Sequence, residues 1–553
     1  MTHQATTIPG CLFPWNERAM CNALPVFVLC CFIVLSWAGV ALASLTVLFD
    51  TSKYSGDVWL QIQDPNAGTG NALQATYNSG QSAITYGTHQ TTDDPPQTVT
   101  NLMSTPVKLS AIGSGGLTVN KSISCVYYLF YDDPSGGTNY LTTAPSVFTT
   151  PQRFQQFEMT MNGGSGDQGN LTNIDAFTAP LSIKSYQSNP LQAPSGPVLQ
   201  STGYGNWTAN QIAGLLVRAG ASGAAVLKDS SGKLIRYIGP SIFDPGNAQV
   251  VNPWPSFVPY AQSLTSTTTT LQRANAFGAG NATWASTQTY TFGIDMQATT
   301  ASDGTITASG KLTAAVSNPA SVTSPNPALP AGGAWTNVSI TISPTTGTNG
   351  IADYNAAIYG QSGSPVVDPQ DSAKWILNNT AITLGPDWDN FQTFCMNTLG
   401  DPSLAENPST NASLQDLQAY LTTLNMALGE LTTGLLGGYF GSTYQVTFEG
   451  TTAAIGTLPS QDWWQMDPLV GFSQIQSDPT HYNRYASVIW TTSNNTVYGV
   501  PYSDRFGSGP LVNTVLTPDM QTSVGYWVVG VGAPATGASL ATPAPDILLL
   551  LNK

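Results

Sequence analysis

Two carboxylic acids, Glu158 and Asp175, lie in a segment with the side-chain pattern of an active site. In a β-strand, alternate side chains share one face, so Phe157 and the two methionines that follow at alternate positions would point into a core. The opposite face then carries Glu158, Thr160 and Asn162. A row of carboxyl, hydroxyl and amide groups at two-residue spacing suits the hydroxyl groups of a sugar.

The glycine-rich segment 163–169 predicts a turn into a second strand, Asn170–Phe177, which bears Asp175. If the two strands pair, both carboxyl groups face one cleft. Glycoside hydrolysis uses such a pair, in which one carboxylic acid protonates the leaving oxygen and the other group activates water or stabilises charge. The same spacing also fits a solvated hairpin with a surface Glu and Asp, so spacing alone leaves both interpretations open.

The composition limits the classes of partner. Only 8% of the 553 residues are charged, against about 25% in an ordinary soluble domain. Hydrophobic residues make up 41% and aromatic residues 10% of the chain, which favours packed cores over disorder. With 16 basic and 31 acidic residues and a net charge of −15, the chain is poorly suited to nucleic acid or to an anionic membrane surface. A neutral polysaccharide is compatible with it.

The N-terminal segment predicts export. An uncharged apolar run, Pro25–Ala43, ends in Ala-Leu-Ala, so residues 1–43 read as a signal peptide cleaved before Ser44. The alternative is an uncleaved signal anchor, which would tether the protein to a membrane. After cleavage, Cys125 and Cys395 are the cysteines that remain, and one disulfide between them is an open alternative.

Short β-segments bounded by turn residues dominate the chain after the leader and predict a sandwich or barrel. They include Leu45–Phe49, Val58–Ile62, Ser124–Tyr131 and Phe157–Met161. From Tyr482 onward this strand pattern returns.

Two helices interrupt the strands. Asn206–Ala221 has apolar residues at helical spacing behind Thr208, a suitable N-cap. A capping box at Ser413 starts a stripe of seven leucines that ends at Gly437, which predicts a buried helix face.

The pattern predicts a β domain that is interrupted by a mixed domain. We expect residues 44–200 to form the first part of the β domain, with the catalytic strands. Residues 201–475 would form a mixed α/β domain with a β-rich insertion near 261–348, and residues 476–553 would return to the β domain.

The segment FEMTMN…LTNIDAFTAPLSI resembles the central motif of glycoside hydrolase family 64, the laminaripentaose-producing β-1,3-glucanases of the thaumatin-like superfamily. The matching polar positions are Glu158, Thr160, Asn162, Thr172 and Asp175. A second, later segment, 497–505, is similar to the family's Tyr-Gly-Phe-x-Tyr-Asp-Asp stretch and contains Asp504. The family's loop tryptophan has no counterpart in this sequence.

The resemblance implies a mainly β fold, in which a thaumatin-like β-barrel or sandwich domain and an inserted α/β domain flank a wide groove. It also implies an inverting endo-β-1,3-glucanase, with Glu158 as general acid and Asp175 as general base. Thr160, Asn162, Thr172 and Asp504 would bind the substrate. For Asp504, an ion pair with its neighbour Arg505 is the alternative.

Other residue types give no competing chemistry. The three histidines are scattered, and no phosphate-binding glycine motif is present, so we expect no metal and no cofactor. Trp388, Trp463 and Trp464 fit sugar stacking or core packing equally well.

The rival hypotheses are a non-catalytic thaumatin-like protein that binds carbohydrate, and a structural protein of the cell envelope. A retained carboxylate pair distinguishes the enzyme from a pure binder.

Overall fold

The structure is a computed structural model. It describes residues 44–77, 82–83, 86–90, 98–103, 105–134, 145–162, 168–187, 197–243, 252–277, 290–316, 329–344, 352–359, 365–368, 371–377, 379–399, 418–463, 472–476, 478–499, 511–513 and 524–538. Asp504, Trp464 and the predicted cap at Ser413 lie outside these residues, as does the leader 1–43. By their internal contacts, residues from Ser44 onward form one compact unit.

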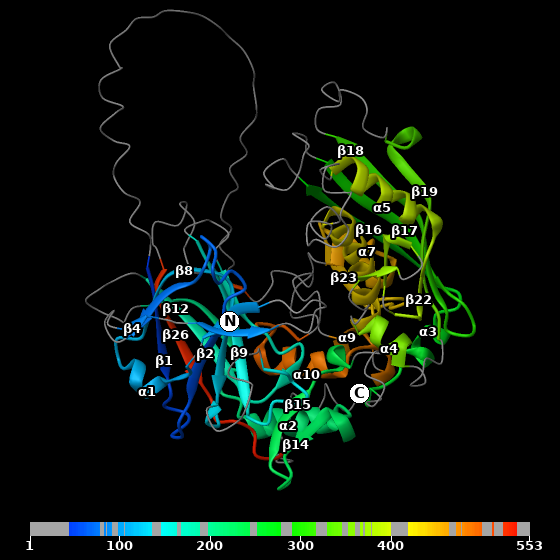
Figure 1. Cartoon of the computed structure of the whole chain (residues 1–553). Coiled ribbons are helices and arrows are strands. Elements are labelled where there is room, and N and C mark those ends of the chain that lie inside the picture. Colours follow the sequence, from blue (N-terminus) through cyan, green and yellow to red (C-terminus); the bar gives the residue numbers. More distant parts are fainter. Residues whose placement is uncertain are drawn as a thin grey trace, which may run out of the picture. The chain divides into compact units, whose positions relative to one another are not determined.

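The largest sheet contains fourteen of the described strands (Figure 1). Its main path runs β13 (Val198–Gly203), β12 (Leu181–Gln187), β26 (Val524–Val531), β1 (Leu45–Asp50), β8 (Leu117–Phe130), β2 (Trp59–Gln63), β6 (Thr98–Met103) and β5 (Tyr86–Gln90). The strands off this path are β3 (Gln74–Tyr77), β4 (Ser82–Ala83), β7 (Val107–Lys108), β9 (Phe154–Met161), β10 (Gln168–Leu171) and β25 (Leu511–Asn513). β1 pairs parallel with β26, and the other pairs are antiparallel.

The long strand β8 takes part in both halves of this sheet, pairing first with β1 and β3 and then with β2 and β9. Its register against β9 shifts at a bulge, where Ser124 has a positive φ of 54°. The side chains that point inward from the β1 part of the sheet and from the β9 part pack against each other. Gly169 on β10 lies so close to the ring of Trp527 on β26 that an added Cβ would be 2.4 Å from it.

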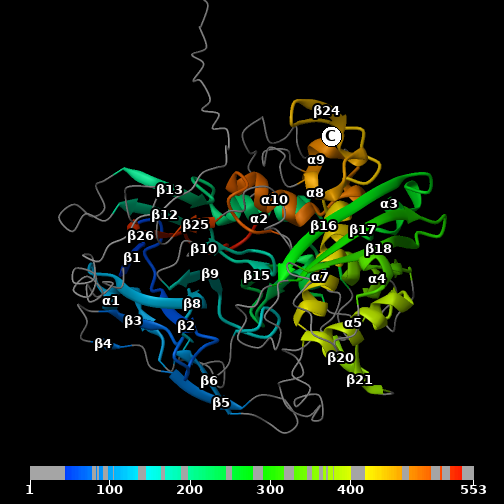
Figure 2. The ribbon, with the colours of Figure 1, turned by 90° about the horizontal axis from the view of Figure 1, so that it is seen from above.

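A five-stranded antiparallel sheet lies in the middle of the chain. Its order is β16 (Thr268–Phe277), β17 (Tyr290–Thr300), β18 (Ile306–Val316), β19 (Ala334–Ile342) and β22 (Ile382–Leu384). Helices α5 (Pro386–Leu399) and α7 (Gln418–Leu436) cover one of its faces (Figures 1 and 2). Trp388 is fully buried between them and donates to the carbonyl of Ser339. Trp463 is buried too, so both tryptophans serve the core.

The predicted helices are confirmed where the structure describes them. α2 (Ala209–Arg218) begins behind Thr208, which forms a capping box with Gln211. In α7 the leucines of the stripe from Leu424 to Leu435 are buried and Leu421 is half-buried, and the helix ends at Leu436, directly before Gly437. Leu414 and Leu417 lie outside the described residues. The remaining elements are short: α1 (Leu109–Ile112), α3 (Val258–Ser263), α4 (Ala352–Ile358), α8 (Ser460–Trp463), α9 (Phe472–Ile475), α10 (Arg484–Ser493), β11 (Ala176–Phe177), β14 (Val226–Lys228), β15 (Leu234–Ile238), β20 (Pro365–Asp368), β21 (Asp371–Leu377), β23 (Gln445–Phe448) and β24 (Thr451–Ala454).

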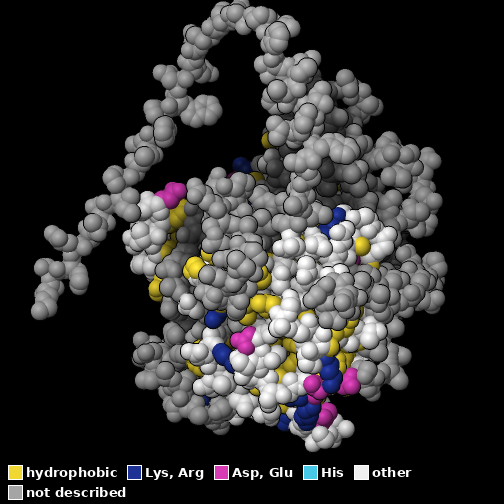
Figure 3. Space-filling view, turned by 90° about the vertical axis from the view of Figure 1, so that its left-hand side faces the viewer, with side chains coloured by type: hydrophobic (Ala, Val, Ile, Leu, Met, Phe, Trp, Pro, Cys, Tyr) yellow, Lys and Arg dark blue, Asp and Glu magenta, His cyan; other side chains and the backbone are white. Residues whose placement is uncertain are grey.

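The fold is therefore mostly β with some helices, as predicted, and none of the sheets described here closes into a barrel. Cys125 and Cys395 are both buried and free, so the disulfide between them is not formed. Within the described part of the chain, we find no helix with the length and hydropathy needed to cross a membrane. Figure 3 shows small groups of charged side chains on a mainly uncharged face, as the composition predicts.

Candidate active site

Glu158 lies near the middle of β9, and the alternation predicted for that strand is confirmed. Phe157, Met159 and Met161 are buried, while Glu158 and Thr160 are half-buried on the other face. The ring of Phe157 stacks on Tyr127 with a centroid distance of 4.8 Å, which fixes the inward face of the strand. The carboxyl group of Glu158 therefore points away from the core of the sheet.

The neighbouring strand supplies a partner for that carboxylate. Asn170 on β10 is directly opposite Glu158 in the antiparallel register. Its Nδ2 donates a hydrogen bond to Glu158 Oε2 over 3.4 Å. This amide orients the carboxylate from the side and remains uncharged, so it does not neutralise Glu158.

Asp175 does not lie on a strand that pairs with β9. The single predicted strand Asn170–Phe177 is wrong, because the chain divides there into β10 and β11 with an irregular segment, 172–175, between them. β11 then pairs with β15 instead. The reason is local hydrogen bonding: Asn173 Nδ2 bonds the carbonyl of Ala176 over 2.8 Å, which turns the backbone out of the ladder.

The segment that carries Asp175 is held by residues from distant parts of the chain. Buried Asn173 is its centre, since Tyr204 donates to Asn173 Oδ1 over 2.7 Å and Tyr485 donates to the Asn173 carbonyl over 2.6 Å. Ser241 Oγ bonds the next carbonyl, that of Ile174. Position 175 is thereby fixed by a network of neutral hydrogen bonds.

Gly239 adds one more hydrogen bond to the segment that carries Asp175. Its N–H donates to the carbonyl of Asp175 over 2.8 Å. A Cβ at position 239 would lie 2.3 Å from the carbonyl oxygen of Ile174, so only glycine allows β15 to approach this closely.

The two carboxyl groups interact electrostatically. Burial raises the pKa of Asp175, and the negative charge of Glu158 raises it further. Tyr128 on β8 is affected by both carboxyl groups. Burial is the largest cause of its raised pKa, and the negative charges of Glu158 and Asp175 add to it. Its hydroxyl donates to Gln63 Oε1 over 3.0 Å. Tyr128 is not among the predicted site residues, although alternation within β8 places it on the same face as Glu158.

An aromatic cluster continues this face of the sheet beside the carboxylates. Tyr128, Phe130 and Phe154 form it, and half-buried Trp59 packs against it. Trp59, Phe130 and Phe154 are aligned across β2, β8 and β9 by the pairing register. The face thus combines carboxylates, amides and aromatic rings, which is the mixture that polysaccharides bind.

The four predicted substrate-binding residues differ in their positions and contacts. Thr160 accepts a hydrogen bond from the backbone N–H of Ser124 over 3.0 Å, so its oxygen supports the bulge in β8. Asn162 is exposed at the end of β9, and Thr172 is half-buried where it bridges Tyr498. Asp504 lies outside the described residues.

Among the residues described, no group of three His, Cys, Asp or Glu side chains is arranged to hold a metal ion.

Replacing Asp175 by Asn should stabilise the protein at neutral pH. A carboxyl group whose pKa is raised on folding contributes stability below its unfolded pKa near 3.9, and this contribution is lost as the pH rises through the folded pKa. We therefore expect a higher melting temperature for Asp175→Asn at pH 7 and a smaller gain near pH 3.5. Scanning calorimetry would measure both, with Asp57→Asn on the exposed surface as control. A lower melting temperature for Asp175→Asn at pH 7 would contradict the free-energy cost that we ascribe to ionised Asp175.

The fold is mostly β, and Glu158 on β9 is close enough to Asp175, in the segment 172–175, to raise the pKa of its carboxyl group. No model of a known protein family matches the sequence, and no curated protein matches it. Among solved structures, the chain is similar to a β-1,3-glucanase domain (GH64) from Clostridium beijerinckii. The sequences are 13% identical, the alignment covers 89% of this chain and 98% of that chain, and the TM-score is 0.38.

Proposed function

We propose that this protein is an exported glycoside hydrolase that cleaves β-1,3-glucan within the chain and inverts the anomeric centre. The observation that carries the proposal is the carboxylate pair, since Glu158 contributes to the raised pKa of Asp175 and both act on the pKa of Tyr128. Structural ion pairs bring opposite charges together, whereas two like charges held close cost free energy. Such an arrangement is typical of catalytic sites.

In this proposal, Glu158 protonates the glycosidic oxygen and Asp175 removes a proton from the attacking water. The raised pKa of Asp175 makes its carboxylate a stronger base than an ordinary aspartate. Inversion requires space for a water molecule, so the two carboxyl groups should be roughly 6.5–9.5 Å apart in the complex.

Several features of the site suit a neutral polymer. The Asn170 amide beside Glu158 and the exposed Asn162 can bond sugar hydroxyls. Half-buried Trp59, with the Lys108 ammonium 5.1 Å from its ring centre, borders the same face. The proposal includes export by the leader 1–43, with cleavage before Ser44. The rival is a carbohydrate-binding protein without catalysis.

A substrate panel separates the enzyme from the binder. The chain from Ser44 onward would be incubated with laminarin and curdlan, and with alginate as the anionic comparison. We expect oligosaccharides from the two β-1,3-glucans and none from alginate, because the negative charges of Glu158 and Asp175 would repel uronates. Retention on curdlan without any released sugar would contradict the enzyme and support the binder.

A further inference from the structure

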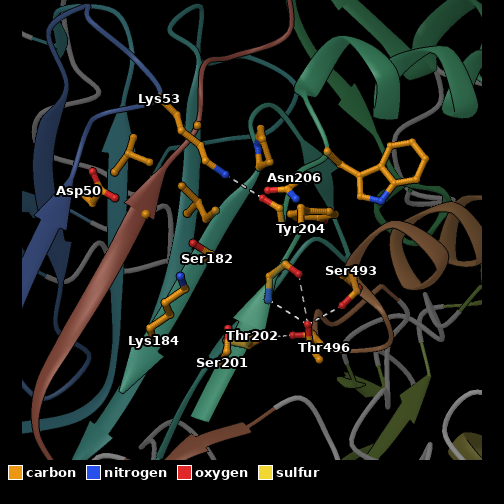
Figure 4. A pocket seen from close by; sticks show the side chains of 18 of the residues that line it. Asp50, Lys53, Ser182, Lys184, Ser201, Thr202, Tyr204, Asn206, Ser493 and Thr496 are labelled. Carbon is orange, nitrogen blue, oxygen red and sulfur yellow. Dashed lines mark hydrogen bonds between the residues drawn. The ribbon is translucent and has the colours of Figure 1, made fainter. Parts of the chain in front are cut away.

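A hollow of about 620 Å³ lies over the sheet, and Glu158 is not among the residues that line it (Figure 4). Strands β1, β12, β13 and β26 form its floor, and the turn Gly203–Trp207 and the end of α10 form its wall. A neighbouring hollow of about 480 Å³ shares this turn, together with Ser493 and Asn494. We call the two hollows together the β12 groove.

Side-chain alternation places the β12 groove and Glu158 on opposite outer faces. On β12, Leu181 and Ile183 are buried, whereas Ser182 and Lys184 face the groove. On β9 the buried residues are those that alternate with Glu158. The inward sides of the two halves of the sheet meet at the contact of β10 with Trp527. The groove therefore does not open onto the face that carries Glu158.

The lining of the β12 groove is rich in uncharged hydrogen-bonding groups. Apolar surface from Pro180, Leu181 and Val528 lies among these groups. One half-buried indole, Trp207, lines both hollows. Ser182, Ser201, Asn206 and Asn494 supply donors and acceptors. An indole face beside hydroxyl and amide groups suits a sugar ring.

The wall of the groove is held in place before any ligand binds. Lys53 Nζ donates to the carbonyl of Gly205 over 2.8 Å and fixes the turn. Thr496 Oγ1 accepts from the N–H of Gly203 over 2.9 Å and donates to the Ser493 carbonyl over 2.6 Å. Thr202 Oγ1 donates to the carbonyl of Thr496. Figure 4 shows these bonds converging on Thr496. A fixed wall reduces the entropy lost on binding.

Three charged groups, Asp50, Lys53 and Lys184, stand at the exposed rim of the groove and leave one net positive charge. The carboxylate of Asp50 accepts a hydrogen bond from the N–H of Ser52, and Lys53 and Lys184 are close enough to stabilise its charge. One negative and two positive groups thus share the rim. A neutral chain can lie across them without leaving a buried charge unpaired.

We propose that the β12 groove is a second, non-catalytic binding site for a neutral polysaccharide chain. It would hold the protein on an insoluble polymer while the opposite face remains available for a separate chain. The inference rests on the proposed function for the choice of β-1,3-glucan as the polymer, and on the groove for the site itself.

The test measures binding separately from hydrolysis. Retention on curdlan would be measured in the Glu158→Gln/Asp175→Asn background, so that the polymer stays intact. Two groove variants are added to it: Trp207→Ala, which removes the indole, and Asn206→Arg, which obstructs the groove from an exposed position and does not disturb the core. Val198→Ala, exposed on β13 and outside the groove lining, is the control. Bacterial production without N-glycosylation is needed, because Asn206 and Asn494 each begin an Asn-x-Thr sequence.

We expect both groove variants to bind curdlan roughly tenfold more weakly than the control, as for the loss of one good contact. Binding should change little between low and high salt. Equal retention of all variants, or no retention of the parent, would overturn the proposal, as would preferential, salt-sensitive binding of alginate. Absence of hydrolysis by the wild-type protein would instead refute the proposed function and leave this result interpretable.

Discussion

Glu158→Gln is expected to lower the turnover of laminarin by a factor of 10² or more, but to leave much of the activity on an aryl β-glucoside with a good leaving group. A sugar oxygen leaves slowly unless it is protonated, whereas a dinitrophenolate leaves without an acid. Asp175→Asn should lose activity on both substrates, because water must still be deprotonated. Steady-state kinetics on the two substrates measure the contrast.

The pH profile provides a second readout of the same assignment. Since burial and Glu158 raise the pKa of Asp175, activity should fall on the acid side at a higher pH than for an ordinary aspartate. Exposed Asn162 offers a control substitution, Asn162→Ala, which removes a predicted sugar contact and no carboxyl group. If Asp175→Asn keeps the aryl activity and Glu158→Gln loses it, the two roles are reversed. If neither variant loses activity, the pair is not catalytic.

Arg236→Met is expected to destabilise the protein by about 3–5 kcal/mol, the largest effect of any single side chain discussed here. Arg236 on β15 is almost fully buried, and its guanidinium donates to the carbonyls of Ser146, Val147, Thr150 and Gln152. It also lies 4.3 Å from the ring centre of Phe154, at the start of β9. Its removal would leave several buried carbonyl groups without a donor.

Thermal unfolding would measure this loss, with Lys228→Met on the exposed end of β14 as the matched control. Arg236→Lys should restore little, because one ammonium group cannot reach carbonyls that a planar guanidinium contacts on two sides. A melting temperature for Arg236→Met equal to that of the control would contradict the structural role of Arg236.

The face of β9 could be predicted because strand alternation is a local property. Phe157 and Met159 are apolar and Glu158 is not, so the sequence alone determines which side faces the core. The same applies to α2, where Thr208 and Gln211 carry the capping signal within four residues.

The position of Asp175 could not be predicted in this way. Its segment turns out of the ladder at the local bond from Asn173 to Ala176, but it is held in place by Tyr204 and Tyr485, and Tyr485 is more than 300 residues away in sequence. No local sequence pattern predicts a contact between residues so far apart in the chain. The β12 groove was missed for the same reason, since Gly203 and Thr496 meet only in the folded chain.

Proton NMR of laminari-oligosaccharide hydrolysis follows the cleaved bond and its stereochemistry at once. We expect the wild-type protein to release the α-anomer first, since inversion of a β-linkage by Glu158 and Asp175 gives that product before mutarotation. The Glu158→Gln/Asp175→Asn double variant should release none. First appearance of the β-anomer would exclude inversion. An unchanged spectrum with wild-type protein, or release of sugar by the double variant, would contradict catalysis by this pair.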